Sequence, residues 1–135
     1  MKRLSMLWLA AVLCLAATGC AATGGIEISG GVNKVPSVRI DDISLSGDYE
    51  VREQACLIRS AGGFMEVSVS IRNLRGSTGK IMYKFDWFED NGMPVAPDSS
   101  IWLPKILQPG AEDSLKKTAP DRLAAAYKLR VMRLK

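Results

Sequence analysis

Apolar and polar residues alternate most regularly along residues 79–88, and this alternation predicts a long β-strand. One face of the strand carries four large side chains, Ile81, Tyr83, Phe85 and Trp87, and the other carries Met82, Lys84 and Asp86. Because each aromatic side chain buries roughly 150–250 Å², the first face is expected to form the centre of a hydrophobic core. Asn91-Gly92, a dipeptide typical of tight hairpins, then predicts a turn.

A second strand is predicted over residues 64–73, where Met65, Val67, Val69 and Ile71 alternate with polar residues. Shorter apolar segments predict further strands over residues 37–46, 55–59, 101–103, 111–118 and 127–135. In the strand over residues 37–46, a bulge at Asp41-Asp42 is needed so that the apolar residues before and after it all face inward. Gln108-Pro109-Gly110 has the residue order of a type II turn.

These segments predict an all-β fold. About seven short strands, turn signals at roughly ten-residue spacing and no long helix are typical of an antiparallel immunoglobulin-like β-sandwich. A small β-barrel is the alternative fold. The sandwich is expected to lack a disulfide, because Cys14 lies in the signal described next and Cys20 at its end, which leaves only Cys56.

The chain begins with a segment that resembles a bacterial lipoprotein signal. Lys2 and Arg3 precede an apolar run over residues 4–17, which is too short to span a membrane. The run ends in Ala17-Thr18-Gly19-Cys20, which resembles a lipobox apart from Ala17, where leucine is most common. The resemblance implies cleavage before Cys20 and lipidation of its sulfur; an ordinary secretory signal cut nearby is the alternative. Because Ala21 and not aspartate follows the cysteine, the resemblance implies an outer-membrane anchor facing the periplasm.

Three regions are therefore expected. Residues 1–19 form the signal peptide, residues 20–36 the lipidated cysteine with a flexible glycine-rich tether, and residues 37–135 the β-sandwich domain. The short alternating fragment Ile26-Glu27-Ile28 leaves open that a strand begins inside the tether. Loss of Lys2 and Arg3 with the signal lowers the formal net charge from +4 to +2, so nucleic acid is not an expected partner.

The second half of the chain resembles the YcfL family of periplasmic lipoproteins. The similarity rests on Asn73 at a strand end, the Tyr83-Lys84-Phe85-Asp86-Trp87-Phe88 strand before Gly92, the turn at residues 108–110 and the apolar strand over residues 127–134. It covers about residues 64–135 and the signal. The resemblance implies an immunoglobulin-like lipoprotein of unassigned activity, and it supplies no catalytic residues.

Catalytic chemistry is not expected, because the chain has no histidine and so lacks the commonest general base and zinc ligand. Cys56 is expected to be a buried thiol that packs as a small hydrophobe. Asp86, Glu89 and Asp90 form the densest acidic group, and solvated turn carboxylates explain them better than a cation site. We therefore predict a protein that is not an enzyme and that needs no metal, cofactor or small-molecule substrate.

The features left for function are surfaces. Lys128, Arg130, Arg133 and Lys135 load the last strand with positive charge, which indicates either contact with an anionic partner or protection of a sheet edge. Trp102 lies in a proline-rich segment, where it either packs across the end of the sandwich or anchors an interface. We predict partner contact at Trp102, Pro97 and Pro104. The expected function is a protein-interaction or accessory module of the cell envelope, and the alternative is a binder of peptidoglycan or another envelope polymer.

Lipidation at Cys20 can be tested by substitution. Cys20→Ser removes the only sulfur that the lipobox resemblance offers, so we expect unprocessed precursor and no labelling by an alkyne fatty acid in cells. The parent chain expressed at the same level is the control. Equal labelling of both proteins would contradict the prediction.

Overall fold

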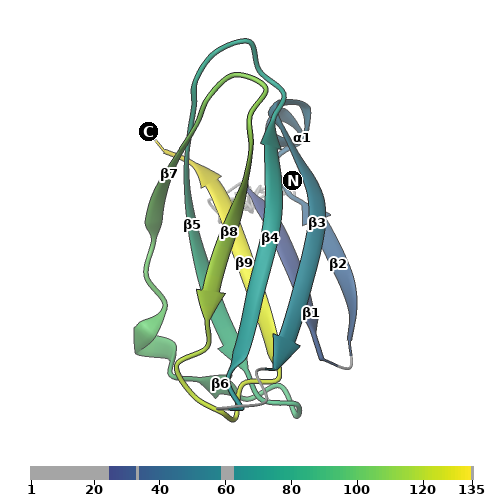
Figure 1. Ribbon diagram of the computed structural model, residues 1–135, viewed down its shortest axis with the longest axis vertical. Coiled ribbons are helices and arrows are strands. Elements are labelled where there is room, and N and C mark those ends of the chain that lie inside the picture. The colour runs from purple at the N-terminus through teal and green to yellow at the C-terminus, as the bar shows by residue number, and fades with distance from the viewer. Residues whose placement is uncertain (1–24, 33, 59–62, 135) are drawn as a thin grey trace, which may run out of the picture.

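The computed structural model describes residues 25–32, 34–58 and 63–134. These residues form two antiparallel sheets that pack face to face, as Figure 1 shows. Strands pair only within their own sheet across the described ranges, so the sandwich prediction is confirmed and the barrel alternative is excluded. Cys56 is a free thiol, and the same ranges hold no disulfide. None of their helices is long and apolar enough to cross a membrane.

The larger sheet has the strand order β2-β1-β9-β5-β6, with β7 also paired to β5. Its strands are β1 (Ile26–Gly31), β2 (Lys34–Ile40), β5 (Gly79–Phe88), β6 (Pro94–Val95), β7 (Leu103–Leu107) and β9 (Ala126–Arg133). The smaller sheet has the order β3-β4-β8, and its strands are β3 (Tyr49–Ile58), β4 (Met65–Asn73) and β8 (Glu112–Thr118). A short helix, α1 (Ile43–Asp48), joins the sheets, and a 3-10 turn, η1 (Pro97–Ser99), precedes β7.

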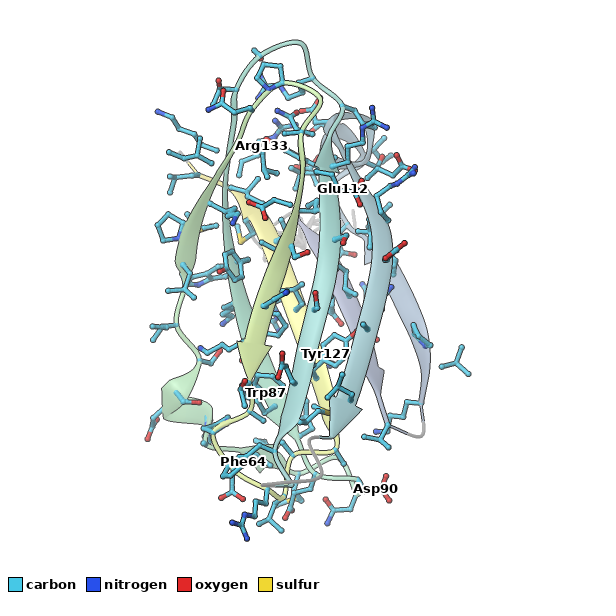
Figure 2. All side chains as sticks on the ribbon, in the orientation of Figure 1. Phe64, Trp87, Asp90, Glu112, Tyr127 and Arg133 are labelled. Atoms are coloured by element: carbon cyan, nitrogen blue, oxygen red, sulfur yellow. The ribbon has the colours of Figure 1, made fainter. Side chains whose placement is uncertain are left out.

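The predicted central strand, β5, pairs with β9 along one side and with β7 and β6 along the other. Phe85 and Trp87 are buried on its inner face and stack with ring centroids 5.5 Å apart. Tyr127 of β9 lies beside them, 6.3 Å from Phe85 and directly across the ladder from Trp87 (Figure 2). The prediction that this strand forms the centre of the core is confirmed.

The smaller sheet supplies the opposite wall of the core. All four inward residues of β4, Met65, Val67, Val69 and Ile71, are fully buried, as the alternation predicts. Leu115 of β8 is buried beside them. The predicted turn between β7 and β8 is also present, because the backbone N–H of Ala111 donates to the carbonyl of Gln108 and Gly110 takes a φ of 68°.

The structure excludes one of the two explanations for the charges of the last strand, that it is a protected sheet edge. Strand β9 lies between β1 and β5, and Tyr127, Leu129 and Val131 on its inner face are buried. The phenol of Tyr127 donates a hydrogen bond to Oε1 of Gln54 at 3.1 Å. Burial, assisted by the nearby Cys56 sulfur, raises the pKa of Tyr127 to about 12. Edge protection therefore does not explain the charges of this strand.

The tether predicted over residues 20–36 is wrong from residue 26 onward, and so is the domain boundary at residue 37. Ile26 and Ile28 of β1 are buried in the core, and β1 pairs with both β2 and β9. A Cβ atom on Gly31 would lie 2.5 Å from the carbonyl oxygen of Ala125, so the glycine meets a steric need rather than a need for flexibility. The predicted signal over 1–19 and residues 20–24 lie outside the described residues.

The strand predicted over residues 37–46 is also corrected. It ends at Ile40, and Asp42 caps α1 by accepting a hydrogen bond from the backbone N–H of Ser44 at 2.9 Å. Leu45 is buried but Ile43 is 85% exposed. Strand β3 is longer than the predicted 55–59 segment. Strand β1 contains the Ile26-Glu27-Ile28 fragment, for which the sequence leaves a strand open, and β6 was not predicted.

Asn73 is a fully buried polar residue at the end of β4. Its Nδ2 atom donates to the carbonyls of Ser77, Leu107 and Gln108 at 2.9, 3.1 and 3.2 Å. Its Oδ1 atom accepts from the backbone N–H of Arg75 at 2.9 Å. One side chain thus joins the β4–β5 loop to the turn after β7, which fixes how the two sheets connect.

Substitutions at Asn73 should separate the loss of these bonds from the effect of charge. Asn73→Ala leaves buried carbonyls without a donor and should lower the free energy of unfolding by about 1–3 kcal/mol at any pH. Asn73→Asp should cost more at neutral pH, because a carboxylate would face carbonyl oxygens and its pKa would rise. That extra cost should vanish at low pH, where the carboxyl is protonated, and grow as the pH rises through the raised pKa. Denaturant titrations from acid to neutral pH give the comparison, and a cost of Asn73→Asp that does not depend on pH would contradict this account.

Candidate functional site

The outer face of the larger sheet carries pairs of similar side chains across the β5–β9 ladder. Met82 lies opposite Met132 and Lys84 lies opposite Arg130. Directly opposed side chains in antiparallel strands have Cβ atoms about 4.5–5.5 Å apart, so Lys84 and Arg130 form a like-charge pair that costs stability. The structure thus keeps two cations together in the middle of a sheet face.

The same row of side chains continues across β1 and β2. Arg130 lies opposite Glu27, and Glu27 lies opposite Arg39. Four neighbouring strands therefore present, in spatial order, Lys84, Arg130, Glu27 and Arg39. This row holds three cations and one carboxylate, although the formal net charge of the whole chain is only +4.

The ion pairs around this row leave cationic groups available. Arg39 donates through Nε to Asp41 at 2.9 Å, but the closest approach of Arg130 to Asp86 is 3.8 Å, too long for a hydrogen bond. Within the described ranges Lys84 has no carboxylate partner, and its Nζ lies 5.0 Å from the centre of the Trp102 ring. The ammonium group of Lys84 is therefore free to meet an anion.

The path of the chain after β5 brings Trp102 to this face. The chain turns through β6 and η1 and returns along β5 as β7, with Leu103 opposite Tyr83. Ala96, which caps η1, holds a left-handed φ of 44°, a conformation that a residue with a side chain seldom adopts. The segment thereby places Trp102, 40% exposed, beside the Lys84 side chain.

Together these side chains line an open pocket of about 470 Å³. Its charged and aromatic wall is formed by Glu27, Arg39, Asp41, Lys84, Trp102 and Arg130. Met132 adds an apolar surface. The pocket combines an aromatic ring with three cations and two carboxylates, an arrangement suited to holding an anionic group next to an apolar one.

A comparison with known protein families identifies the family of this chain. Residues 36–133 match the profile of the family described as "Protein of unknown function (DUF1425)". The chain belongs to the DUF1425 family. The match begins inside β2, so β1 lies before the matched region.

Two solved structures share the fold of this DUF1425 chain. A DUF1425 family member from Shewanella sp. PV-4 is 18% identical, with a TM-score of 0.58, and the match covers 85% of this chain and 94% of that one. Campylobacter jejuni cj0090 is 22% identical, with a TM-score of 0.54, and the match covers 62% of this chain and 85% of that one. The search of curated proteins gave no match.

The sequence predicted only part of this pocket. Trp102 lines it, whereas Pro104 lies on β7 opposite Met82 and Pro97 opens η1, so the two prolines shape the segment and do not line the pocket. Cys20 lies outside the described residues. Glu27 and Arg39 were missed because they lie in the predicted tether and in a strand considered alone. Only the pairing of β1 with β9 shows that they join Arg130.

The other candidate groups of the DUF1425 chain do not form a second site. Cys56 is half-buried on β3, and burial raises the pKa of its thiol, which disfavours the reactive thiolate. Asp86 accepts a hydrogen bond from the Ser100 hydroxyl and faces Arg130, so it is not grouped with the turn residues Glu89 and Asp90. The described ranges hold no cluster of three metal-binding side chains.

The two tryptophans provide a matched test of the pocket. Trp87→Ala empties a buried position and should cost about 3–5 kcal/mol of unfolding free energy. Trp102→Ala should cost only about 1 kcal/mol, since it removes a partly exposed ring and one cation–π contact. Denaturant titration of both variants gives the comparison. A loss of similar size at both positions would show that Trp102 is a core residue and not part of a binding surface.

Proposed function

We propose that this DUF1425 protein is a lipid-anchored module of the bacterial cell envelope that binds an acidic segment of a partner protein through the Trp102 pocket. In this proposal Cys20 carries the lipid, the outer membrane holds the anchor and the domain faces the periplasm. The protein acts by binding and not by catalysis. The family match supports a domain of unassigned activity, and the anchor and the partner are proposals that rest on the residues of this chain.

The observation that carries the proposal is the like-charge pair of Lys84 and Arg130 next to Trp102. Opposed like charges destabilise a sheet, so a fold selected for stability alone would not place them there. A bound carboxylate offsets this repulsion, and each hydrogen bond from a charged donor contributes about 1.5–3 kcal/mol. Tryptophan and arginine are also the residues that most often dominate binding at interfaces.

The alternative function is binding of peptidoglycan or another envelope polymer. Glu27 and Asp41 in the same pocket could accept hydrogen bonds from sugar hydroxyls, while the cations meet the carboxylates of the polymer. We favour a protein partner because the row of charges crosses four strands, which suits an extended segment laid across the sheet better than a single sugar unit.

Site-specific photocrosslinking in cells tests the proposal. A photoreactive amino acid at Ile101, 54% exposed and next to Trp102, should capture a distinct protein. The same group at Leu57, 52% exposed on the smaller sheet, is the matched control and should not. In the protein with the photoreactive amino acid at position 101, Lys84→Glu should lower the yield of the crosslinked adduct at least about tenfold. A tenfold fall corresponds to a loss of about 1.4 kcal/mol of binding free energy.

Lys84→Glu also gives a stability readout that a simple folding defect cannot mimic. The substitution replaces a like-charge pair with an opposite-charge pair, so the melting temperature should stay equal or rise slightly while binding is lost. Loss of the adduct together with a large fall in melting temperature would contradict a binding role for Lys84. Sedimentation of the purified domain with isolated sacculi, abolished by Lys84→Glu, would instead support the polymer alternative.

A further inference from the structure

One end of the sandwich gathers several chain segments around α1. Figure 1 shows that β1 begins and β9 ends at the end where α1 lies. The backbone N–H of Asp41 donates to the carbonyl of Gly25 at 2.9 Å, and the backbone N–H of Leu74 donates to the carbonyl of Asp48 at 2.7 Å. Arg133 of β9, labelled at this end in Figure 2, binds Asp48 of α1. Gly25, α1 and Leu74 are thus held together.

The spacing between Cys20 and this end is short. Five residue steps separate Cys20 from Gly25, and even a fully extended chain spans only about 17–18 Å over that distance. The segment between Cys20 and the sandwich is shorter than the predicted tether, because residues 26–31 belong to the sheet. A lipid on Cys20 would therefore keep the α1 end close to the membrane surface, whatever path residues 20–24 take.

Apolar side chains are exposed at the same end. Ile43, the first residue of α1, is 85% exposed, and Leu74 and Ile40 are 47% and 45% exposed. Between the sheets on this side lies an open groove of about 290 Å³, lined mainly by apolar residues that include Ile40, Val51 and Leu74. Contiguous apolar surface on a soluble domain marks a place of contact with another apolar phase.

Ile43 is held rigidly in this exposed position. Asp42 caps α1 at its N-terminus, and the fully buried Leu45 anchors the helix in the core. The hydroxyl of Ser46 donates to the carbonyl of Ile43 at 2.7 Å. These bonds hold the backbone on both sides of Ile43, whose side chain is exposed.

The carboxylates around Ile43 already have partners. Asp41 binds Arg39, Asp48 binds Arg133, and Asp42 accepts hydrogen bonds from the N–H and hydroxyl of Ser44. Hydrogen bonding to Ser44 lowers the pKa of Asp42, so it stays ionised and keeps this role. Arginines thus neutralise two of the three carboxylates, Asp41 and Asp48, which reduces the repulsion that an anionic lipid surface would meet here.

We infer that the α1 end of the sandwich is a membrane-contact surface, on which Ile43, Ile40 and Leu74 lie against the phospholipid leaflet that holds the Cys20 lipid. The inference rests on the proposed lipid anchor. A strand added by a protein is a poorer occupant of this side, since the edge strand β2 carries Pro36 and β3 has a register irregularity between Val51 and Glu53. The contact orients the domain, so that the outer face of the larger sheet stands upright from the membrane.

The test uses the mature lipidated protein in vesicles of phosphatidylethanolamine and phosphatidylglycerol. In a Cys56→Ser background, a polarity-sensitive fluorophore is attached to a cysteine introduced by Ile43→Cys or, as the control, by Val35→Cys. Val35 is 87% exposed, and on β2 it is about 17 Å from Ile40. The two sites are thus equally accessible but lie at different distances from the α1 end.

The emission of the fluorophore at position 43 should shift to the blue. Nitroxide lipids should quench it several-fold more than they quench the fluorophore at position 35. Equal quenching at both sites, or none at either, would overturn the inference while leaving the anchor intact. In vesicles without nitroxide lipid, fluorescence quenching that increases with protein concentration would indicate that a second copy of the chain covers this surface. That result would also overturn the inference. Failure of an alkyne fatty acid to label Cys20 would remove the anchor and the inference together.

Discussion

The ladder between β5 and β9 determines both faces of the larger sheet at once. On the inner face it places Trp87 beside Tyr127 and Phe85 next to both rings, which brings together the three largest buried side chains of the described residues. On the outer face the same register opposes Lys84 and Arg130. A shift of one residue would exchange the two faces, so the burial of the aromatic rings fixes positions 84 and 130 opposite each other on the outer face. The core thereby supplies the stability that holds a polar pocket in place.

Much of the fold follows from local patterns. The alternation in β4 and β5 predicts strands with one buried face, and Pro109-Gly110 predicts the turn before β8, because these signals need only neighbouring residues. The glycines of β1 do not predict a strand, since their role depends on Ala125 and Tyr127, far away in the chain. Helix α1 depends on one cap at Asp42 within a segment whose apolar residues also fit a strand.

The candidate pocket was predictable only in outline. The exposed Trp102 and the charges of the last strand stand out in the sequence, but their meaning depends on which strands become neighbours. Arg39 and Arg130 lie in β2 and β9, and Glu27 of the intervening β1 links them through two separate ladders. Cross-strand contacts between distant segments leave no periodic signal in the chain, whereas a buried strand face does.

The pairing of β1 with β9 has a consequence for the order in which the chain folds. The first and last strands of the described domain are hydrogen-bonded neighbours, so the larger sheet cannot be completed until the final residues are available. Such distant contacts slow folding, because the loop between them must close before they form. A chain that leaves the ribosome N-terminus first therefore cannot complete this sheet during synthesis. The topology delays the complete larger sheet until the last strand, Ala126–Arg133, has been made.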